Sequence, residues 1–134
     1  MKAMTPMRRD VLQIIARQRT PLSAYDVLAQ LKISHASATA TGVYRSIGWL
    51  EERKFVRRIA SLRAFIACSP AVADQPGLLL CRHCYAVSSF EHAALGELIE
   101  EHARTTDFNI ASVIFEVWGT CATCHALHGD AERT

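Results

Sequence analysis

The 134-residue chain is long enough for one domain with a full core or for two small ones, and half of its residues are hydrophobic. No stretch approaches the roughly 18 consecutive apolar residues that a membrane-spanning helix needs, and the first ten residues contain no apolar leader. We therefore expect a cytoplasmic protein with no membrane partner, a location that disfavours structural disulfides among its five cysteines.

The charge is distributed unevenly along the chain. Residues 1–68 hold 12 Lys and Arg against 4 Asp and Glu, a net charge of +8, whereas residues 69–134 hold 3 against 9, a net charge of −6. A basic half joined to an acidic half indicates that the first half meets a polyanion and the second does not. The sign changes around residues 69–77, which contain two prolines and a glycine, as a linker often does. We expect two domains, over residues 1–68 and 78–134, joined by a hinge over residues 69–77.

The basic half begins with signals for two short helices. Thr5 is a suitable N-cap and Pro6 a suitable first helical residue, and the apolar side chains that follow fall on one helical stripe. Ser23 and Asp26 can form a capping box, with Asp in place of the usual Glu, ahead of a second apolar stripe. These patterns predict two amphipathic helices that share a core.

A third helix and a hairpin complete this half. The helix is expected to begin near Ser37 or Thr39 and to end near Arg53. Its buried stripe would be Val43, Ile47 and Leu50. Residues 55–60 and 63–68 are predicted strands, separated by a very short turn. Three short helices followed by a two-stranded hairpin are typical of a winged helix-turn-helix.

In such a fold the third helix enters the major groove of double-stranded DNA, where Arg can reach guanine edges. The side of this helix opposite the apolar stripe carries Thr41, Tyr44, Arg45 and Gly48. We expect Arg45 to read bases. Other basic side chains are expected to position the protein on phosphates, namely Arg8, Arg9, Arg57, Arg58 and Arg63. The alternative is a small helical domain whose exposed Arg and Tyr side chains only solvate its surface.

The acidic half is predicted to combine strands with one helix. Residues 78–90 read as two strands, and residues 92–105 as a helix with His102 packed on its apolar stripe. Residues 108–119 read as a strand that is apolar on both faces. Because so small a domain cannot cover both faces itself, we expect a second copy of the chain to do so, giving a homodimer.

Two Cys-x-x-C pairs follow the first and last strands of this half, with 36 residues between them: Cys81, Cys84, Cys121 and Cys124. Four thiolates form a tetrahedral zinc site, which would tie the last strand to the first and make zinc binding part of the folding energy. The alternatives are a redox pair, which needs a Cys-x-x-C at a helix N-terminus, and coincidence. A closed four-cysteine site leaves no position for a water, so we expect neither an enzyme nor a small-molecule substrate.

With these residues in place, the chain resembles the ferric uptake regulator superfamily, and most of all its zinc uptake regulator branch. The matching segments are MTPMRRDVL, GVYRSIGWLEERKFVRRI, LLLCRHCYAVSSFE and VWGTCATC, and they span nearly the whole chain. The resemblance implies an α+β protein with an N-terminal winged helix-turn-helix and a small C-terminal α/β dimerisation domain. It implies a homodimeric, metal-responsive transcriptional repressor in which Tyr44 and Arg45 read DNA and the four cysteines hold a structural zinc.

The regulatory metal site of that family is reduced in this sequence. The His-rich run that usually precedes the first Cys-x-x-C is here QPGLLL, and Ser89 and Val113 occupy positions that usually carry an acidic residue and a histidine. Cys68 stands where zinc uptake regulators place a cysteine ligand, but Arg57 stands eleven residues before it. The candidates for a remaining regulatory zinc site are Cys68, Glu91 and His92, with Asp74 as a further ligand.

Cys68 therefore has three interpretations: a small side chain packed at a strand end, a zinc ligand, or a redox-reactive thiol. They leave open a metal-independent or redox-responsive regulator, or a zinc-storing protein, as alternatives to a metal-responsive one.

Overall fold

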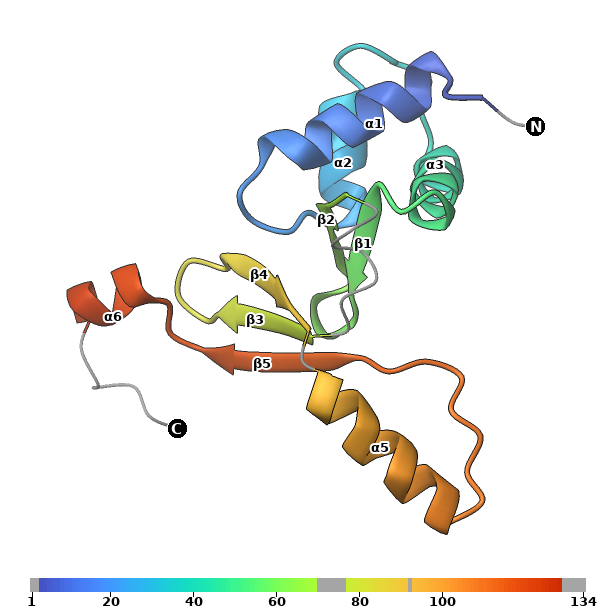
Figure 1. The fold of residues 1–134 in the computed structure, drawn as a ribbon. Coiled ribbons are helices and arrows are strands. Elements are labelled where there is room, and N and C mark those ends of the chain that lie inside the picture. The colour runs from blue at the N-terminus through green and yellow to red at the C-terminus, as the bar shows by residue number, and fades with distance from the viewer. Residues whose placement is uncertain (1–2, 70–76, 92, 129–134) are drawn as a thin grey trace.

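The computed structural model describes residues 3–69, 77–91 and 93–128. Three helices and a hairpin adjoin a three-stranded sheet that carries two more helices (Figure 1), which confirms the α+β class. In chain order the elements are α1 (Pro6–Arg17), α2 (Ala24–Leu31), α3 (Ala40–Glu52), β1 (Val56–Ile59), the 3-10 turn η1 (Ala60–Leu62), β2 (Ala64–Ala67), β3 (Gly77–Cys81), β4 (Val87–Phe90), α5 (Ala93–Thr105), β5 (Phe115–Gly119) and α6 (Ala122–His128). Within these ranges no helix is long and apolar enough to cross a membrane.

The first three helices begin where their capping residues predict. The Thr5 side chain accepts a hydrogen bond from the Arg8 backbone N–H at 3.2 Å, with Pro6 as the first helical residue. Ser23 and Asp26 form the predicted capping box, each side chain accepting the other's backbone N–H at 3.1 Å. Thr39 caps α3 by accepting the Gly42 N–H at 3.1 Å. Each cap satisfies a donor that the first helical turn leaves free.

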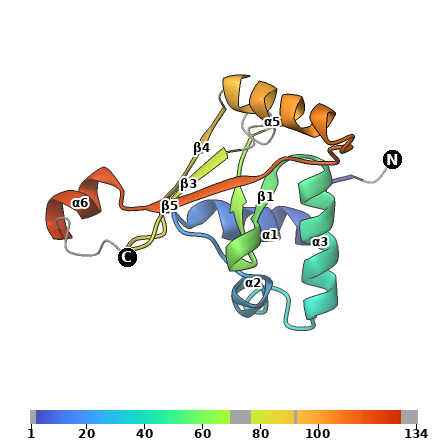
Figure 2. The same ribbon diagram turned by 90° about the horizontal axis from the view of Figure 1, so that it is seen from below.

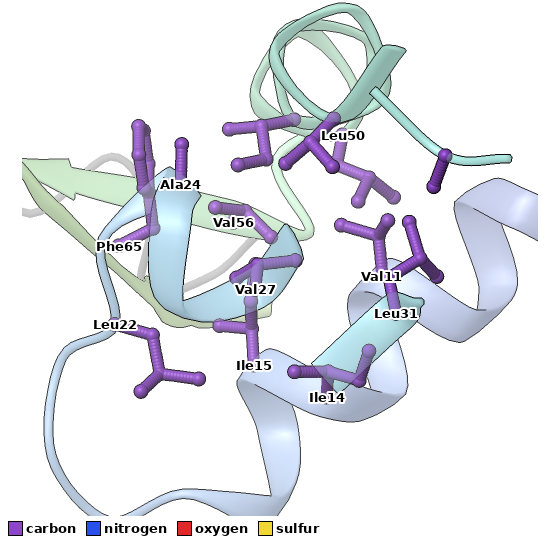
Figure 3. Close-up of a cluster of buried hydrophobic side chains, with 13 residues drawn as sticks. Val11, Ile14, Ile15, Leu22, Ala24, Val27, Leu31, Leu50, Val56 and Phe65 are labelled. Atoms are coloured by element: carbon purple, nitrogen blue, oxygen red, sulfur yellow. The ribbon is translucent and has the colours of Figure 1, made fainter. Parts of the chain in front are cut away.

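One hydrophobic core joins the three helices to one face of the hairpin (Figure 3). Its most deeply buried members are Val11, Ile15, Val27, Leu31, Val43, Ile47 and Leu50. The last three are the predicted stripe of α3, which is confirmed. Burying side chains of this size stabilises the fold by about 1.5–3 kcal/mol each, so α3 is held rigidly with its other side outward.

The hairpin β1–β2 packs against other elements on both of its faces. Val56 and Phe65 point into the helical core, whereas Ile59 and Ile66 belong to a second cluster beneath it. The change of side follows from the two-residue period of a strand. This second cluster contains Leu78 and other side chains of the next sheet, so the hairpin connects the two halves of the molecule.

The second sheet has the order β4-β3-β5, with β3 antiparallel to β4 and parallel to β5. One face contributes Leu78, Leu80 and Trp118 to the cluster beneath the hairpin. On the other face Leu79 and Val117 are 47% and 48% exposed. Among the described residues of one chain, the sheet is thus covered on one side only.

The C-terminal half differs from the sequence prediction in three places. The strand predicted over residues 108–119 is confined to β5, because β3 pairs only with residues 115–119. His102 is exposed rather than packed, since α5 buries only Ala103 among its residues and projects away from the sheets in Figure 1. The helix α6 was not predicted. It lies at the opposite end of the molecule from α3 in both ribbon views (Figure 2).

Candidate nucleic-acid interface and metal centre

The outer side of α3 presents the side chains that the sequence assigns to DNA. Thr41 and Arg45 are exposed, and Tyr44 is 48% exposed, while the opposite stripe anchors the helix in the core. A rigid helix with short and long polar groups on its free face has the form needed to enter a major groove.

The hairpin of β1, η1 and β2, called the wing below, lies beside this face of α3. A shallow cleft of about 300 Å³ is lined by Tyr44 of α3 together with Arg58, Ala60, Arg63 and Phe65 of the hairpin. Arg63 has a left-handed backbone (φ 50°) directly after η1, which turns the chain between the two strands. The structure therefore brings Tyr44, Arg58 and Arg63 together on one surface.

Arg58 is held along this surface without being buried. Its guanidinium carbon lies 5.4 Å from the centroid of the Phe65 ring, and its Nη2 lies 3.7 Å from a carboxylate oxygen of Glu51. The Arg58 side chain is 57% exposed, so this ion pair is largely screened by water. Arg58 is thus positioned but accessible to a phosphate.

Arg8 is tied to α3 by a ring contact. Its guanidinium carbon lies 4.5 Å from the centroid of the Trp49 ring, and its Nη1 donates to the carbonyl of Ala3 at 2.6 Å. Arg53 lies 5.0 Å from the same ring. Arg8 therefore fastens the start of α1 to α3, whereas Arg9 is exposed to solvent.

Arg57 is not brought to the cleft. It pairs with Ile66 across the hairpin, on the face that turns toward the second sheet, and it is partly buried. Burial lowers the pKa of Arg57, and electrostatic interactions with Cys68 and Glu116 partly oppose that shift. Arg57 therefore lies on the side of the hairpin that faces the second sheet, away from the cleft beside α3.

The four predicted cysteines come together at the far end of the sheet. Their sulfur atoms all lie within 4.8 Å of one another, and the Sγ atoms of Cys84 and Cys121 are 3.7 Å apart. Four sulfurs placed about 2.3 Å from one zinc ion in a tetrahedron are about 3.8 Å apart. The cluster therefore has the size of a closed tetrahedral metal site.

The sheet explains why these cysteines meet. Cys81 ends β3 and lies opposite Gly119 of the parallel strand β5, which leads into Cys121. Cys84 lies in the turn between β3 and β4, and Cys124 lies in α6. The parallel pairing of β3 with β5 thus brings Cys81 and Cys121 together, although they are far apart in sequence.

Hydrogen bonding and burial act differently on two of these thiols. The Cys121 backbone N–H donates to Cys81 Sγ at 3.4 Å, and this hydrogen bond, together with others from Cys84 and His83, lowers the pKa of Cys81 to about 5. Burial raises the pKa of Cys124 to about 12. One thiolate is therefore ready to bind at neutral pH, whereas a metal ion must displace a proton from the other.

Cys68 has a different environment. Its Sγ donates to the carbonyl of Lys54 at 3.4 Å, and burial raises its thiol pKa, while Arg57 opposes the shift. Within the described ranges, only the four-cysteine cluster gathers three or more possible metal ligands, so Cys68 and the exposed Glu91 join no such group. His92 and Asp74, the other candidates, lie outside the described residues.

One residue at the junction was missed in the sequence. Glu116 of β5 accepts the Ser61 N–H of the hairpin turn through Oε1, at 3.3 Å. A lone acidic residue in an apolar strand was the available signal, and its partner could not be foreseen because it lies 55 residues earlier.

The chain is similar to known regulators over most of its length. Residues 1–118 match the Ferric uptake regulator family. The Zinc uptake regulation protein of Escherichia coli (strain K12) is 29% identical over 125 residues, which cover 90% of this chain and 72% of that protein.

Solved structures agree. A zinc uptake regulator complexed with zinc and DNA has a TM-score of 0.84 at 28% identity, covering 93% of this chain and 85% of that one. Holo XcZur has a TM-score of 0.80 at 30% identity, covering 92% and 86%. Members of this family are DNA-binding transcription regulators and not enzymes. The chain belongs to the ferric uptake regulator family, in its zinc uptake regulator branch.

Proposed function

We propose that this chain is a homodimeric repressor of metal-homeostasis genes, with one structural zinc ion per chain held by Cys81, Cys84, Cys121 and Cys124. The observation that carries the proposal is the surface shared by α3 and the wing, where Tyr44, Arg58 and Arg63 line one cleft. The proposed domains are residues 1–68 for DNA and 78–134 for dimerisation, with a hinge over 69–77, in a cytoplasmic protein.

DNA recognition is assigned to two groups of side chains. Arg45, Tyr44 and Thr41 on α3 would meet base edges in the major groove, because this is the exposed side of a buried helix. Arg58 and Arg63 of the wing, with Arg9 of α1, would contact phosphates and set the register of the protein on the duplex. The similarity to a zinc uptake regulator in complex with zinc and DNA supports this assignment.

The homodimer is supported by the apolar surface that a single chain leaves open. Six of its eight exposed large apolar side chains in the described part of the second half are Leu79, Leu95, Leu98, Phe108, Ile114 and Val117; the other two are Tyr85 and Leu127. The first six form the proposed interface. They lie on the open face of the sheet, along α5 and in the segment between them. Since isolated soluble chains rarely expose so many neighbouring apolar groups, a second copy of the chain is the proposed cover.

The zinc is proposed to be structural because of its place in the fold. The four-cysteine cluster lies beside α6, at the end of the molecule opposite α3 (Figure 2). A metal ion there can stabilise the ends of β3 and β5 but cannot touch DNA bound to α3. Its contribution would be the rigidity of the dimerisation domain.

A redox-responsive Cys68 is the less favoured alternative. Burial raises the pKa of the Cys68 thiol, so little of the reactive thiolate form is present at neutral pH. A redox sensor needs that thiolate, so this role is disfavoured. A zinc store would need ions that exchange readily, whereas a closed four-cysteine site holds its ion tightly.

The test is selection of DNA by the purified, zinc-loaded protein from a random duplex pool, with the mass of the protein–DNA complex measured in solution. Enrichment of a two-fold symmetric sequence bound by an even number of chains is expected. Retention of the pool without enrichment, or binding by single chains, would contradict the proposal.

A further inference from the structure

The junction between the wing and the second sheet contains charged groups that neither the DNA surface nor the cysteine cluster uses. We propose that Arg57 and Glu116 act as a metal-independent latch, which fixes the orientation of the DNA-binding half on the sheet. The inference rests on the proposed function, since its consequence is read out in DNA binding.

The first support is the direction in which the two residues face. Arg57 lies two residues before Ile59 on β1 and opposite Ile66 on β2, and both isoleucines pack against the sheet. Glu116 lies two residues before Trp118 on β5, and Trp118 packs against the same cluster. Since side chains alternate along a strand, Arg57 and Glu116 face the junction from opposite sides.

The second support is a hydrogen bond that already crosses the junction. Oε1 of Glu116 accepts the backbone N–H of Ser61 at 3.3 Å, and Ser61 belongs to the turn between β1 and β2. A carboxylate that accepts a backbone N–H makes a stronger bond than a neutral acceptor. Glu116 thus ties the tip of the wing to the last strand of the sheet.

The third support is charge. Arg57 is partly buried with its Nη1 atom shielded from solvent, and the carboxylate of Glu116 interacts favourably with its positive charge. A buried cation is stable only beside compensating groups, so removal of Glu116 leaves Arg57 less well compensated. The two side chains are therefore coupled through the junction that they share.

A guanidinium differs from a bound metal ion in one respect that matters for regulation. Arg remains protonated in proteins and is covalently part of the chain, so the positive charge at the junction never dissociates. Cys68, a candidate metal ligand from the sequence, feels this positive charge, which opposes the rise of its thiol pKa. We therefore expect DNA affinity to be independent of zinc added beyond the structural ion.

The experiment uses the full chain and the duplex that it selects. Affinity and its dependence on salt are measured for the wild type, Arg57→Gln, Arg57→Lys, Glu116→Gln and the double glutamine variant. Arg58→Gln is the matched control, since it removes the same charge from the adjacent residue on the other face of β1. Zinc per chain is measured for each protein to show that the cysteine cluster is filled.

Arg57→Gln and Glu116→Gln are each expected to weaken binding about 5- to 20-fold, within the range usual for coupled sites. The double variant should have the same affinity as the single variant that binds less tightly, because each substitution alone already removes the latch. Neither single variant should change the slope of the logarithm of the binding constant against the logarithm of the salt concentration. Arg58→Gln should reduce this salt slope by about one unit, because it loses a phosphate contact. Arg57→Lys, which keeps the charge, should retain most of the affinity.

Two results would overturn the latch. One is a wild-type affinity for the duplex that rises when zinc is added beyond one ion per chain. This measurement does not depend on the folding of any variant. The other is an Arg57→Gln salt slope that falls as in Arg58→Gln, which would place Arg57 on a phosphate. A wild type that selects no sequence would overturn the proposed function as well.

Discussion

Arg57 and Arg58 are neighbours on β1 but face opposite sides of the wing. The Arg58 guanidinium lies over the Phe65 ring and borders the cleft beside α3, whereas Arg57 is partly buried toward the second sheet. Two identical side chains thus have different surroundings for one geometric reason, the two-residue period of a strand. The wing therefore lines the proposed DNA surface on one side and packs toward the second sheet on the other.

Arg45→Ala should lower the preference for the selected DNA sequence over a random one by about 1–3 kcal/mol, because an Arg on a major-groove helix reads base edges. Competition binding with both duplexes measures this difference. Arg104→Ala on α5 removes the same charge from the other half of the chain and should leave the preference unchanged. Equal losses in the two variants would show that Arg45 contributes only net charge.

Cys121→Ser should abolish stoichiometric zinc and lower the melting temperature, since the metal ties β5 to β3 and its binding energy is part of the folding energy. Zinc analysis and thermal unfolding of the purified protein measure both effects. Removing zinc from the wild type with a chelator should have the same consequence.

Cys68→Ser is the control for that variant, because Cys68 lies outside the four-sulfur cluster. It should keep one zinc per chain. If it loses zinc as Cys121→Ser does, Cys68 is a ligand and the assignment of the metal site is wrong.

Val117→Asp should convert the proposed dimer into monomers. Val117 is 48% exposed on the open face of the sheet, and a carboxylate buried there between two chains would be unpaired. Sedimentation equilibrium gives the mass directly. Ile33→Asp is the control, because Ile33 is 89% exposed but lies beyond α2 in the first half of the chain, away from the second sheet. A dimeric Val117→Asp protein would place the interface elsewhere.

Ser23→Ala should lower the free energy of unfolding by about 1 kcal/mol, because it leaves the Asp26 N–H without its cap. Urea denaturation at fixed protein concentration measures the change. Ser37→Ala, at an exposed position between α2 and α3, should change the stability by less than about 0.5 kcal/mol. Similar losses in both variants would mean that the capping box contributes nothing specific.

Local signals in the sequence predicted the first half of the fold well. Caps at Thr5 and Ser23, and the stripe that contains Val43, depend only on neighbours a few residues away, and the structure confirms each of them. The two Cys-x-x-C pairs have the spacing of metal ligands, so the sequence also predicted that the four cysteines form one cluster.

The remaining features depend on long-range packing, which no local pattern contains. Arg57 could not be separated from Arg58 without knowing that the second sheet covers one face of the wing. His102 was predicted to be packed from a helical stripe that the single chain leaves exposed. The strand over residues 108–119 was predicted too long for a similar reason, because hydrophobicity alone does not say which residues find a paired strand.

The most direct test of the account is one preparation of the full chain in which zinc per chain and affinity for the selected duplex are measured together. The account predicts a dimer with one zinc ion per chain that binds the selected duplex far more tightly than random DNA. A protein that lacks zinc, or that binds all sequences equally, would contradict it.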